Sequence, residues 1–352
     1  MKAPDALLDR LRRGHRFLIT SHINPDGDAV GSSLGLTRVL RKLGKSSVVW
    51  LRDPVPGLYS VLPGADRVHV GTDPPRGFPD QFDAVVVLEC PSLERSGIAD
   101  AVEAAALPVL NVDHHLGNEP YGHVNWVDTA APAVGVLVHR IAEALHVDVD
   151  PATADCLYLA LVTDTGGFRH SNATAQAFDA AAALVREGAG PDKVAQWLYE
   201  SRPESAVRLQ GAVLQTLELH DDGQVATVHV DHDMVAAASA QPGDSEGLID
   251  IPRSIAGVRA VALFRQLEDR RWKASLRSRG EVSVERVARR HGGGGHQNAA
   301  GFTAEPDRQL GGLRSEVVQE LGEAIRLADH AAAERVDATP RDIETDSGTS
   351  DA

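Results

Sequence analysis

The sequence predicts an α/β protein in which a mainly parallel-sheet N-terminal domain is joined by a helical linker to a smaller α+β C-terminal domain. Two patterns support this prediction. The first two hundred residues alternate short apolar runs with helical patterns, which is typical of βαβ units. The last third has several strand-like runs followed by helices. A chain of 352 residues is also too long for one ordinary domain and suits two, since domains average roughly 150 residues.

The N-terminal elements follow from apolar runs and helix stop signals. Strands are predicted at four runs rich in Val, Ile and Leu: 17–20, 47–51, 84–88 and 109–112. Helices are predicted at four longer stretches: 29–43, 134–145, 152–162 and 174–187. Gly44 and Gly188 follow two of these helices, as glycine commonly does at a helix end. We therefore assign the parallel-sheet domain to 1–195.

The C-terminal elements have a different order. A helical stretch with a mixed polar face, interrupted at Pro203, predicts a linker at 196–219. The smaller domain, 220–335, has predicted strands at 225–230, 258–264 and 272–276 and predicted helices at 284–290 and 310–334. The last residues, 336–352, are acidic and lack aromatic side chains, so we expect a disordered tail there.

Charge and cysteine content limit the function classes. A formal net charge of −15 repels long polyanions, which argues against a protein that binds long duplex nucleic acid but not against an enzyme for small phosphorylated substrates. The two cysteines, Cys90 and Cys156, offer no disulfide framework. No apolar run reaches the roughly 20 residues that span a bilayer, and the charged N-terminus is unlike a signal peptide. We therefore expect a cytoplasmic protein without a membrane partner.

Acidic and histidine residues follow the predicted strands, at the edge where an open α/β sheet binds ligands. They are His22, Asp26 and Asp28 after the first strand, Glu89 after the third, Asp113, His114 and His115 after the fourth, and Asp164 after an apolar helix. Simpler explanations exist: Asp28 would cap the helix that begins at Ala29 while Asp26 sits in a turn, and the Asp-His-His run would be an exposed loop. Because all four positions coincide at one edge, a binuclear metal site is the more economical explanation.

Such a site indicates its metal and its chemistry. Carboxylate and imidazole ligands without thiolate suit Mn²⁺, with Mg²⁺, Co²⁺ or Zn²⁺ as alternatives. Two ions about 3.5 to 4 Å apart can hold a bridging hydroxide and clamp a phosphate during in-line displacement. Glu89 and Asp164 are the natural candidates to bridge the two ions.

A glycine cluster, GGGGHQNAAG, predicts a substrate contact in the second domain. Its backbone amides can approach a phosphate or a sugar closely, and its last residues suit a helix start or tight packing. A flexible connector is the alternative explanation. A basic run near 277 and the residues that follow Asp164 add further candidates. The expected substrate contacts are Arg169, Arg277, Ser278, Gly294, Gly295 and His296.

Five ordered motifs make the sequence resemble the DHH phosphoesterase superfamily, specifically its nanoRNase and phosphoadenosine-phosphate phosphatase group with a DHH-associated C-terminal domain. The motifs are SHINPDGDAVGSSLG, VVVLECPSLERSG, NVDHHLGN, LVTDTGGFRH and GGGGHQNAAG. The resemblance implies metal ligands at His22, Asp26, Asp28, His114 and Asp164. It implies catalytic roles for Asp113, His115 and Asp164, with His115 close to the scissile phosphate, and a substrate grip by Arg277 and the glycine loop.

The sequence departs from the family at Glu89, where the second motif usually has Asp; a longer carboxylate could still bridge two ions. The resemblance implies a two-metal phosphodiesterase and 3'-nucleotidase that degrades RNA of about two to five nucleotides and dephosphorylates adenosine 3',5'-bisphosphate. Two alternatives stay open: a cyclic or linear dinucleotide phosphodiesterase, and a nucleotide-binding sensor that has lost catalysis through the change at Glu89. The resemblance is also compatible with a homodimer.

Overall fold

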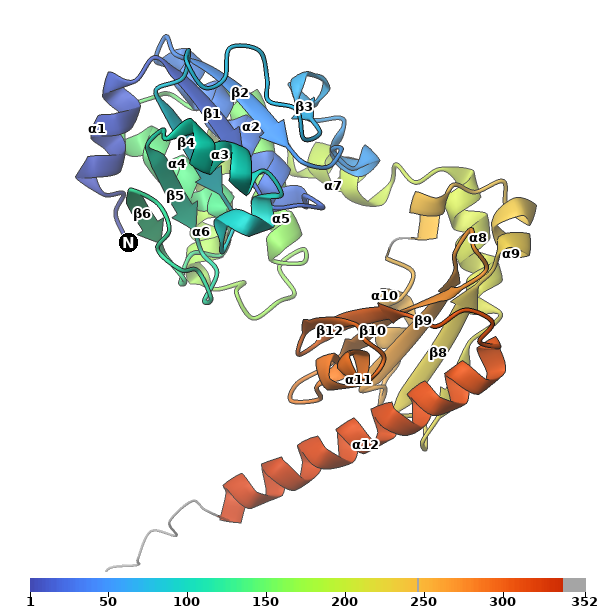
Figure 1. The fold of residues 1–352 in the computed structure, drawn as a ribbon. Helices are drawn as coiled ribbons and strands as arrows, with labels where there is room; N and C mark the ends of the chain where they lie inside the picture. Colours follow the sequence, from blue (N-terminus) through green and yellow to red (C-terminus); the bar gives the residue numbers. More distant parts are fainter. Residues whose placement is uncertain (246, 338–352) are drawn as a thin grey trace, which may run out of the picture. The chain divides into compact units, whose positions relative to one another are not determined.

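The computed structural model of the chain describes residues 1–245 and 247–337, which form two compact units that divide between Ser201 and Arg202 (Figure 1). Each unit has its own sheet and its own apolar core. The parallel sheet of the first unit and the smaller mixed sheet of the second confirm the predicted fold class. Within the described residues, no helix is both long enough and apolar enough to cross a membrane.

A six-stranded parallel sheet forms the centre of the first unit. Its strands, in spatial order, are β3 (His69–Val70), β2 (Ser46–Leu51), β1 (Arg16–Thr20), β4 (Ala84–Leu88), β5 (Val109–Asp113) and β6 (Val124–Val127). All five residues of β4 are buried, which explains its uninterrupted apolar sequence. The strand order reverses direction between β1 and β4, and ligands bind at the carboxyl ends of the strands at such a reversal.

Helices cover both faces of this sheet. They are α1 (Asp5–Arg13), α2 (Gly27–Lys42), α3 (Ala99–Ala105), α4 (Val134–Ala144), α5 (Pro151–Asp164), α6 (Ala175–Arg186) and α7 (Pro191–Tyr199). Side chains of α1, α2, α4 and α5 share one core with Phe17 and Ile19 of β1. On the other face, Val102 of α3 packs in a core with Leu18 of β1. Alternate residues of β1 therefore point to opposite cores, as the pleat of a strand requires.

Glycines on one face of α2 allow α5 to approach closely. A Cβ atom on Gly31 would lie 2.5 Å from the backbone oxygen of Cys156, and one on Gly35 would collide with the Leu157 side chain. These glycines are four residues apart, so they lie on the same face of the helix. The close packing brings the first turn of α2 beside the last turn of α5, where two of the predicted ligands, Asp28 and Asp164, lie.

The second unit has a mixed six-stranded sheet. Its strands, in spatial order, are β11 (Gly294–His296), β12 (Ala299–Thr303), β10 (Trp272–Ser278), β9 (Ala260–Gln266), β8 (Val225–Val230) and β7 (Glu218–His220). The β8–β9 pair is parallel and the other neighbours are antiparallel. Its helices are α8 (Glu204–Leu214), α9 (His232–Ala237), α10 (Asp250–Arg253), α11 (Val284–Arg290) and α12 (Leu310–Asp337).

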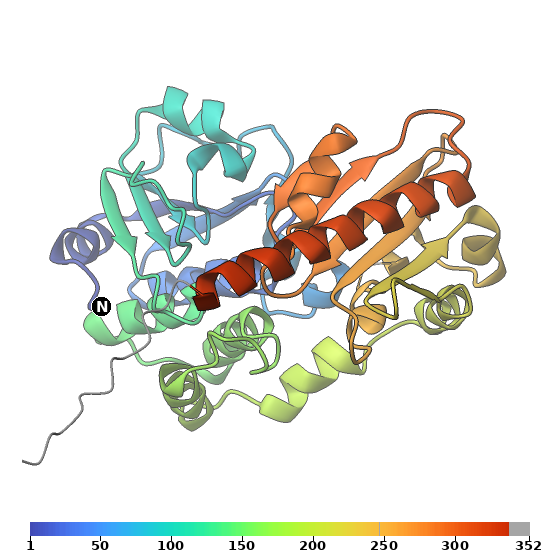
Figure 2. The ribbon, with the colours of Figure 1, turned by 90° about the horizontal axis from the view of Figure 1, so that it is seen from below.

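The two faces of this sheet have separate cores. Figure 2 shows α12 running across one face, where Leu313 and Val317 of this helix pack with Phe264 of β9. On the opposite face, Leu209 of α8 packs with Val261 of β9. The apolar residues of β9 alternate between the two cores, and this alternation is why the strand is buried from Ala260 to Phe264.

Most predicted elements are confirmed within two residues at either end, including the strands β4 and β8 and the helix α11. The short elements α1, α3, β3, β6 and β7 were not predicted, because they lack a long apolar period. Of the two alternatives for the residues from Ala299, the helix start is wrong, because residues 299–303 form β12 with β11 as its edge partner. Tight packing is confirmed, since a Cβ on Gly301 would lie 2.8 Å from the Ala274 backbone oxygen.

The predicted linker 196–219 is divided between the two units. Helix α7 packs on α5 in the first unit, whereas Leu209 and Val213 of α8 are fully buried in a core of the second unit. Pro203, which interrupts the helical pattern, is the N-cap residue of α8 and lies at the division. The acidic tail predicted from residue 336 lies outside the described residues beyond Asp337, where α12 ends.

Candidate metal centre

Acidic and histidine side chains from four chain segments meet at the carboxyl edge of the parallel sheet. His22 follows β1 by two residues, Glu89 follows β4 directly, His114 follows β5 directly, and Asp164 is the last residue of α5. Because β1, β4 and β5 are adjacent and parallel, their carboxyl ends lie side by side. The fold therefore brings these predicted metal ligands together at the reversal in strand order.

Glu89 lies at the centre of the cluster. Its Oε2 atom is 2.8 Å from His22 Nε2, and its Oε1 atom is 3.5 Å from the Nε2 atoms of both His114 and His115. The residue is 2% exposed, and its Oε2 atom has no hydrogen-bond partner among the described residues. A buried carboxylate oxygen without a hydrogen bond is costly unless a cation contacts it. This orphaned oxygen, aimed into a cluster of metal-type ligands, fits a bound metal ion.

Three overlapping groups could each hold an ion. They are His22, Asp26 and Glu89; Glu89, His114 and His115; and Asp28, His114 and Asp164, with the ligand atoms of each group within 4.8 Å of one another. Glu89 belongs to two groups and so does His114. Shared ligands between neighbouring groups are what a binuclear site requires.

Backbone carbonyls orient two of the imidazoles. His22 Nδ1 lies 2.8 Å from the Ile23 carbonyl oxygen, and His114 Nδ1 lies 2.9 Å from that of Ala131. A carbonyl only accepts, so each Nδ1 carries a proton, and in the neutral form of each ring Nε2 keeps its lone pair. Both Nε2 atoms face the Glu89 carboxylate. This arrangement is the one that metal-binding histidines use.

The two aspartates after β1 have different neighbours. The Asp26 side chain accepts a hydrogen bond from Ala29 N at 2.9 Å and is the N-cap of α2. Asp28 is 1% exposed, and its carboxylate accepts hydrogen bonds from the backbone N–H groups of Val134 and Gly135 at the start of α4. The simpler explanation therefore assigned the cap of α2 to the wrong aspartate. Asp28 instead combines a contact to the positive end of α4 with a position beside His114 and Asp164.

Asp113 is bound to His115 rather than to the metal groups. Its Oδ1 atom accepts from His115 Nδ1 at 2.8 Å and its Oδ2 atom accepts from Asn118 Nδ2 at 2.6 Å. Asp113 is fully buried, and His115 keeps an exposed edge with 38% of its side chain accessible. Asp113 thus fixes the tautomer and direction of His115, so that His115 Nε2 faces the cluster.

The electrostatics indicate that the cluster has an excess of negative charge. Burial, with the charges of Glu89 and Asp164, raises the pKa of Asp28 well above its ordinary value. Burial, with Glu89 and Asp26, also raises the pKa of Asp164 to about 6. Buried carboxylates that crowd together favour the neutral form unless cations offset their charge. Divalent cations would offset it here.

The same carboxylates shift the pKa values of the neighbouring histidines. Burial would lower the pKa of His22, but the neighbouring carboxylates of Asp26 and Glu89 raise it to about 10. Burial likewise opposes the effect of Glu89, Asp28 and Asp164 on His114, and these carboxylates raise the pKa of His114 to about 10. In the metal-free chain, protons on the imidazoles would therefore compete with metal ions for the same Nε2 atoms.

The predicted substrate contacts of the second unit lie on its sheet. Arg277 is half-buried on β10 and its Nη1 donates to the Leu276 carbonyl. Gly295 has a positive φ of 146°, and a Cβ there would lie 2.5 Å from the Ala299 backbone oxygen, so β11 needs glycine to approach β12. Gly294 and His296 are exposed on the same strand.

Ser278 lies in a different environment from the other predicted contacts. It is 3% exposed, its hydroxyl donates to the Val282 carbonyl at 2.6 Å, and it accepts from Asn298 Nδ2 at 2.9 Å. These bonds hold the turn between β10 and α11 and occupy the hydroxyl. Arg169, the predicted contact in the first unit, donates from Nε to the Gly166 carbonyl and has an exposed side chain.

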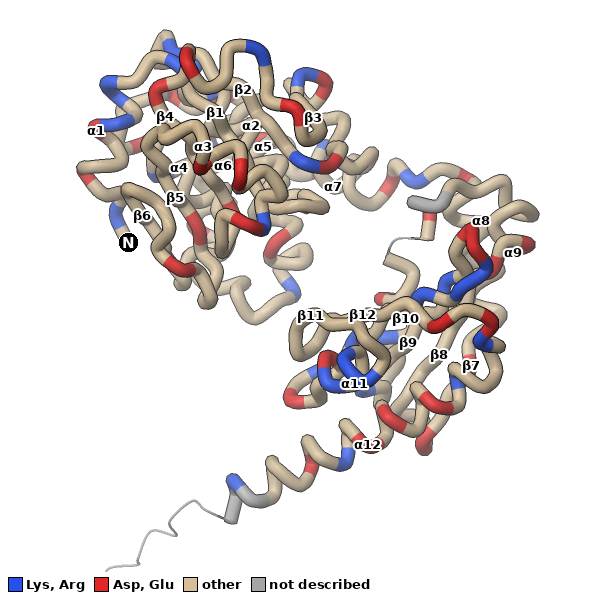
Figure 3. The backbone as a smooth tube through the Cα atoms, viewed as in Figure 1, with Lys and Arg blue, Asp and Glu red and all other residues tan. Residues whose placement is uncertain are grey.

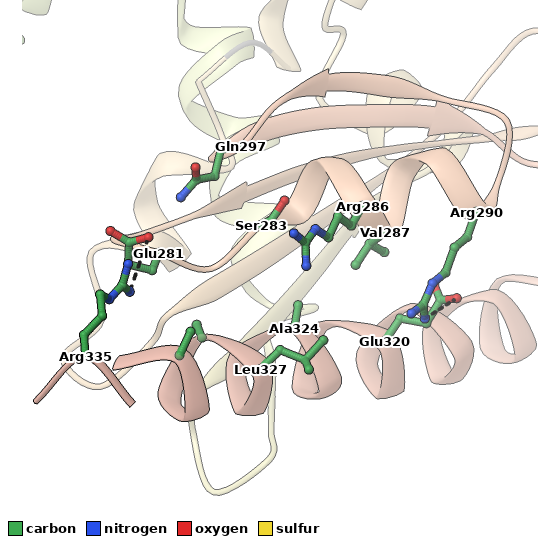
Figure 4. A pocket seen from close by; sticks show the side chains of 12 residues that line it. Glu281, Ser283, Arg286, Val287, Arg290, Gln297, Glu320, Ala324, Leu327 and Arg335 are labelled. Carbon is green, nitrogen blue, oxygen red and sulfur yellow. Dashed lines mark hydrogen bonds and ion pairs between the residues drawn. The ribbon is translucent and has the colours of Figure 1, made fainter. Parts of the chain in front are cut away.

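Arginines also gather on α11, where Arg286, Arg289 and Arg290 lie (Figure 3). The groove between α11 and α12 has a volume of about 240 Å³ (Figure 4). Arg290 pairs with Glu320 across this groove at 3.5 Å. Arg335, at the far end of α12, lies 3.8 Å from Glu281. The first pair joins α11 to α12, and the second joins α12 to the loop that precedes α11.

Sequence reasoning missed two asparagines that hold the cluster. Asn118 donates to Asp113, and Asn172 Nδ2 donates to Asp164 Oδ2 at 3.0 Å. Asn118 lies in the motif NVDHHLGN, so its nearness to Asp113 along the chain was a usable signal. Asn172 carries no local signal, because it precedes α6 in an otherwise polar turn.

Two family descriptions match most of the chain. Residues 16–161 match "DHH family, N-terminal domain" and residues 222–324 match "DHHA1 domain". The first match contains the segments that supply His22 through His115, and the second contains Arg277 and the glycine run. The predicted resemblance is confirmed by both matches.

Known proteins are similar along nearly the whole chain. A Thermus thermophilus protein named bifunctional oligoribonuclease and PAP phosphatase NrnA is 36% identical over 81% of this chain and 83% of its own length. A crystal structure of an exopolyphosphatase-related protein from Bacteroides fragilis has a TM-score of 0.84 and 28% identity, covering 93% of this chain and 98% of that one. The cyclic-di-AMP phosphodiesterase PdeA of Listeria monocytogenes is 25% identical over 87% of this chain but only 48% of its own length.

Proposed function

We propose that this chain, which belongs to the DHH family, is a metal-dependent phosphohydrolase. Its proposed activities are the degradation of very short RNA oligonucleotides and the removal of the 3'-phosphate of adenosine 3',5'-bisphosphate. The observation that carries the proposal is the cluster of three overlapping ligand groups around the buried Glu89 carboxylate. The name of the Thermus thermophilus relative supports the choice of substrates.

The proposal assigns two divalent ions to the cluster, with Mn²⁺ as the preferred metal and Mg²⁺ or Co²⁺ as substitutes. Carboxylate and imidazole ligands without thiolate support this choice. The ligands would be His22, Asp26, Asp28, Glu89, His114 and Asp164. The bound metals would supply Lewis-acid stabilisation of the charge that develops on the transferred phosphate.

The remaining catalytic task falls to His115 and Asp113. His115 Nε2 faces the cluster, and the exposed edge of its ring leaves it accessible to a substrate. The 2.8 Å contact from its Nδ1 to Asp113 keeps the ring in one orientation. We assign His115 to donate a hydrogen bond, and then a proton, to the leaving oxygen of the ester, with Asp113 as its positioning residue.

The second unit would bind the rest of the substrate. Arg277, His296 and the exposed glycine backbone of β11 offer a cation, an imidazole and amide donors, which suit a phosphate and a ribose. Arg169 would add a cation in the first unit. Ser278 would contribute by shaping the turn, since its hydroxyl is already bonded.

A second candidate is hydrolysis of cyclic or linear dinucleotides, and the similarity to PdeA favours it. The same ligand groups would act on either ester. The substrate range therefore separates the two candidates, and the ligand groups do not.

The test is turnover of a 5'-phosphorylated RNA dinucleotide with added Mn²⁺, compared with adenosine bisphosphate, cyclic di-AMP, pyrophosphate and a long RNA. The control is Asp28→Asn, which removes a carboxylate charge from the cluster and keeps its shape. Hydrolysis of the dinucleotide and the bisphosphate, lost in the variant, supports the proposal. A preference for cyclic di-AMP supports the second candidate, and no turnover of any substrate supports a binding protein that lacks catalysis.

The proposal includes a cytoplasmic location and a homodimer. Fractionation of cells and light scattering of the purified chain test these two parts separately from the chemistry.

A further inference from the structure

One short segment is connected by hydrogen bonds, either directly or through one further side chain, to every ligand in the group formed by Asp28, His114 and Asp164. The segment is 131–135, which enters and begins α4. It offers two backbone carbonyls and two backbone N–H groups toward the cluster, and each of them has a partner there. Among the described residues, this segment makes no such hydrogen bond to the group of His22, Asp26 and Glu89.

Two of the three ligands, His114 and Asp28, form hydrogen bonds directly with this segment. The Ala131 carbonyl accepts from His114 Nδ1 at 2.9 Å. The Val134 and Gly135 N–H groups donate to the two carboxylate oxygens of Asp28 at 2.5 and 2.8 Å. Because these N–H groups lie at the start of α4, they also bring the positive end of that helix to the carboxylate. Two of the three ligands are thus fixed by backbone atoms of the same segment.

The third contact passes through Asn172. Its Nδ2 atom donates to the Pro132 carbonyl at 3.1 Å and to Asp164 Oδ2 at 3.0 Å, and it lies 3.3 Å from the Asp164 carbonyl oxygen. Three acceptors around one nitrogen set the orientation of the amide, since an amide oxygen there would be repelled. The cost is visible at the other end, because Asn172 Oδ1 is buried without a hydrogen-bond partner among the described residues.

We propose that segment 131–135 and Asn172 together position the three ligands of this group, with Asn172 as the positioning residue that holds the Asp164 carboxylate. The proposal rests on the proposed function, which supplies the metal. It adds that one metal position is held by a shared scaffold. A ligand that is already oriented loses less freedom when an ion binds, so this position should bind its metal more tightly than it would without the scaffold.

The test compares Mn²⁺ binding to the full chain and to Asn172→Ala by isothermal titration, with the electron paramagnetic resonance spectrum of bound Mn²⁺ as a second readout. Loss of an outer partner of a metal ligand typically weakens metal binding by about 10- to 100-fold. We expect a loss of about tenfold or more at one of two binding steps and a changed spectrum for that ion.

The control is Asp83→Ala. Asp83 lies just before β4, at the opposite edge of the sheet from the cluster. It accepts hydrogen bonds from the His15 and Arg16 backbone N–H groups. Its loss should lower stability and leave Mn²⁺ affinity unchanged. Asn172→Leu is the second variant, since it fills the space of the amide and avoids a cavity if Asn172→Ala does not fold.

The outcomes separate the two proposals. Tight Mn²⁺ binding and hydrolysis by the unaltered chain, with the same affinity in both Asn172 variants, would overturn the positioning role and leave the function intact. Failure of the unaltered chain to bind Mn²⁺ would overturn the proposed function itself. Weaker binding in the Asn172 variants but not in Asp83→Ala supports the positioning role.

Discussion

Replacing Gly31 by Ala tests whether the contact between α2 and α5 sets the geometry of the cluster. The new Cβ would lie 2.5 Å from the Cys156 backbone oxygen and 3.0 Å from the Ala160 Cβ. Real Cβ contacts essentially never fall below 3.0 Å, so the helices must separate by at least 0.5 Å, the difference between 3.0 and 2.5 Å. A backbone atom cannot rotate away as a flexible side chain can. The strain therefore moves the whole helix.

The magnitude has two opposing parts. Overpacking of this kind costs about 1–3 kcal/mol, whereas alanine in place of glycine inside a helix gains about 1 kcal/mol. Gly211 of α8 is the matched control, because a Cβ there meets nothing within 4 Å. Both variants gain the same helix propensity. Their difference in the free energy of unfolding is therefore the packing cost alone, about 1–3 kcal/mol against Gly31→Ala.

Activity provides the second readout. Catalytic groups work within about 0.5 Å of their productive geometry, so a shift of this size between Asp28 and Asp164 should lower turnover by on the order of tenfold or more. The assay is urea unfolding with hydrogen exchange to resolve α2 from α8, followed by Mn²⁺-dependent hydrolysis. Equal stability changes in Gly31→Ala and Gly211→Ala, with full turnover in both, would refute the reasoning.

Three further predictions concern single side chains. First, hydrogen bonds from Thr153 and the Arg38 guanidinium hold the pKa of Asp150 below its ordinary value against the opposing effect of burial. Its stabilisation is thus present above about pH 4 and is lost as pH falls through the folded-state pKa; Asp150→Asn keeps the helix cap and should flatten acid unfolding curves in that range. Second, Ser278→Ala should destabilise the second unit by about 1–3 kcal/mol in urea unfolding, since it strips partners from buried groups, while KM changes little. Third, Arg277→Ala should raise KM for the dinucleotide in steady-state kinetics without that loss of stability, and an unchanged KM would argue against a substrate contact.

The ends of strands carried most of the predictable information about the site. An apolar run that stops at an acidic or histidine residue marks the strand and its carboxyl end together, so Glu89 and His114 could be assigned to one edge before their distances were known. The motif order then added the family. What the strand pattern could not supply was the division of labour between Asp26 and Asp28, because both precede the same helix and either could cap it.

Contacts made by backbone atoms were beyond the reach of the sequence. The Ala131 carbonyl and the Val134 and Gly135 N–H groups bind ligands that lie far away along the chain, and backbone groups leave no trace in residue identity. Asn172 was missed for a related reason, since its partner Pro132 contributes only a carbonyl. Such contacts depend on the tertiary placement of α4 and α5, which residue patterns within either helix do not encode.

Glu89 is the position at which the resemblance of the motifs implies an aspartate, and its surroundings argue that a glutamate there preserves the site. Its backbone is fixed on both sides, because its N–H donates to the Val112 carbonyl and its own carbonyl accepts from Ser21 Oγ. Its φ of 52° is left-handed, a conformation that aspartate adopts more readily than glutamate, so surrounding contacts must hold it there. From this fixed point the longer side chain still brings its carboxylate to the Nε2 atoms of His22, His114 and His115. A chain that had lost its metals would gain nothing from a strained backbone that aims a buried carboxylate at three imidazoles, and this favours a working metal site over a sensor without catalysis.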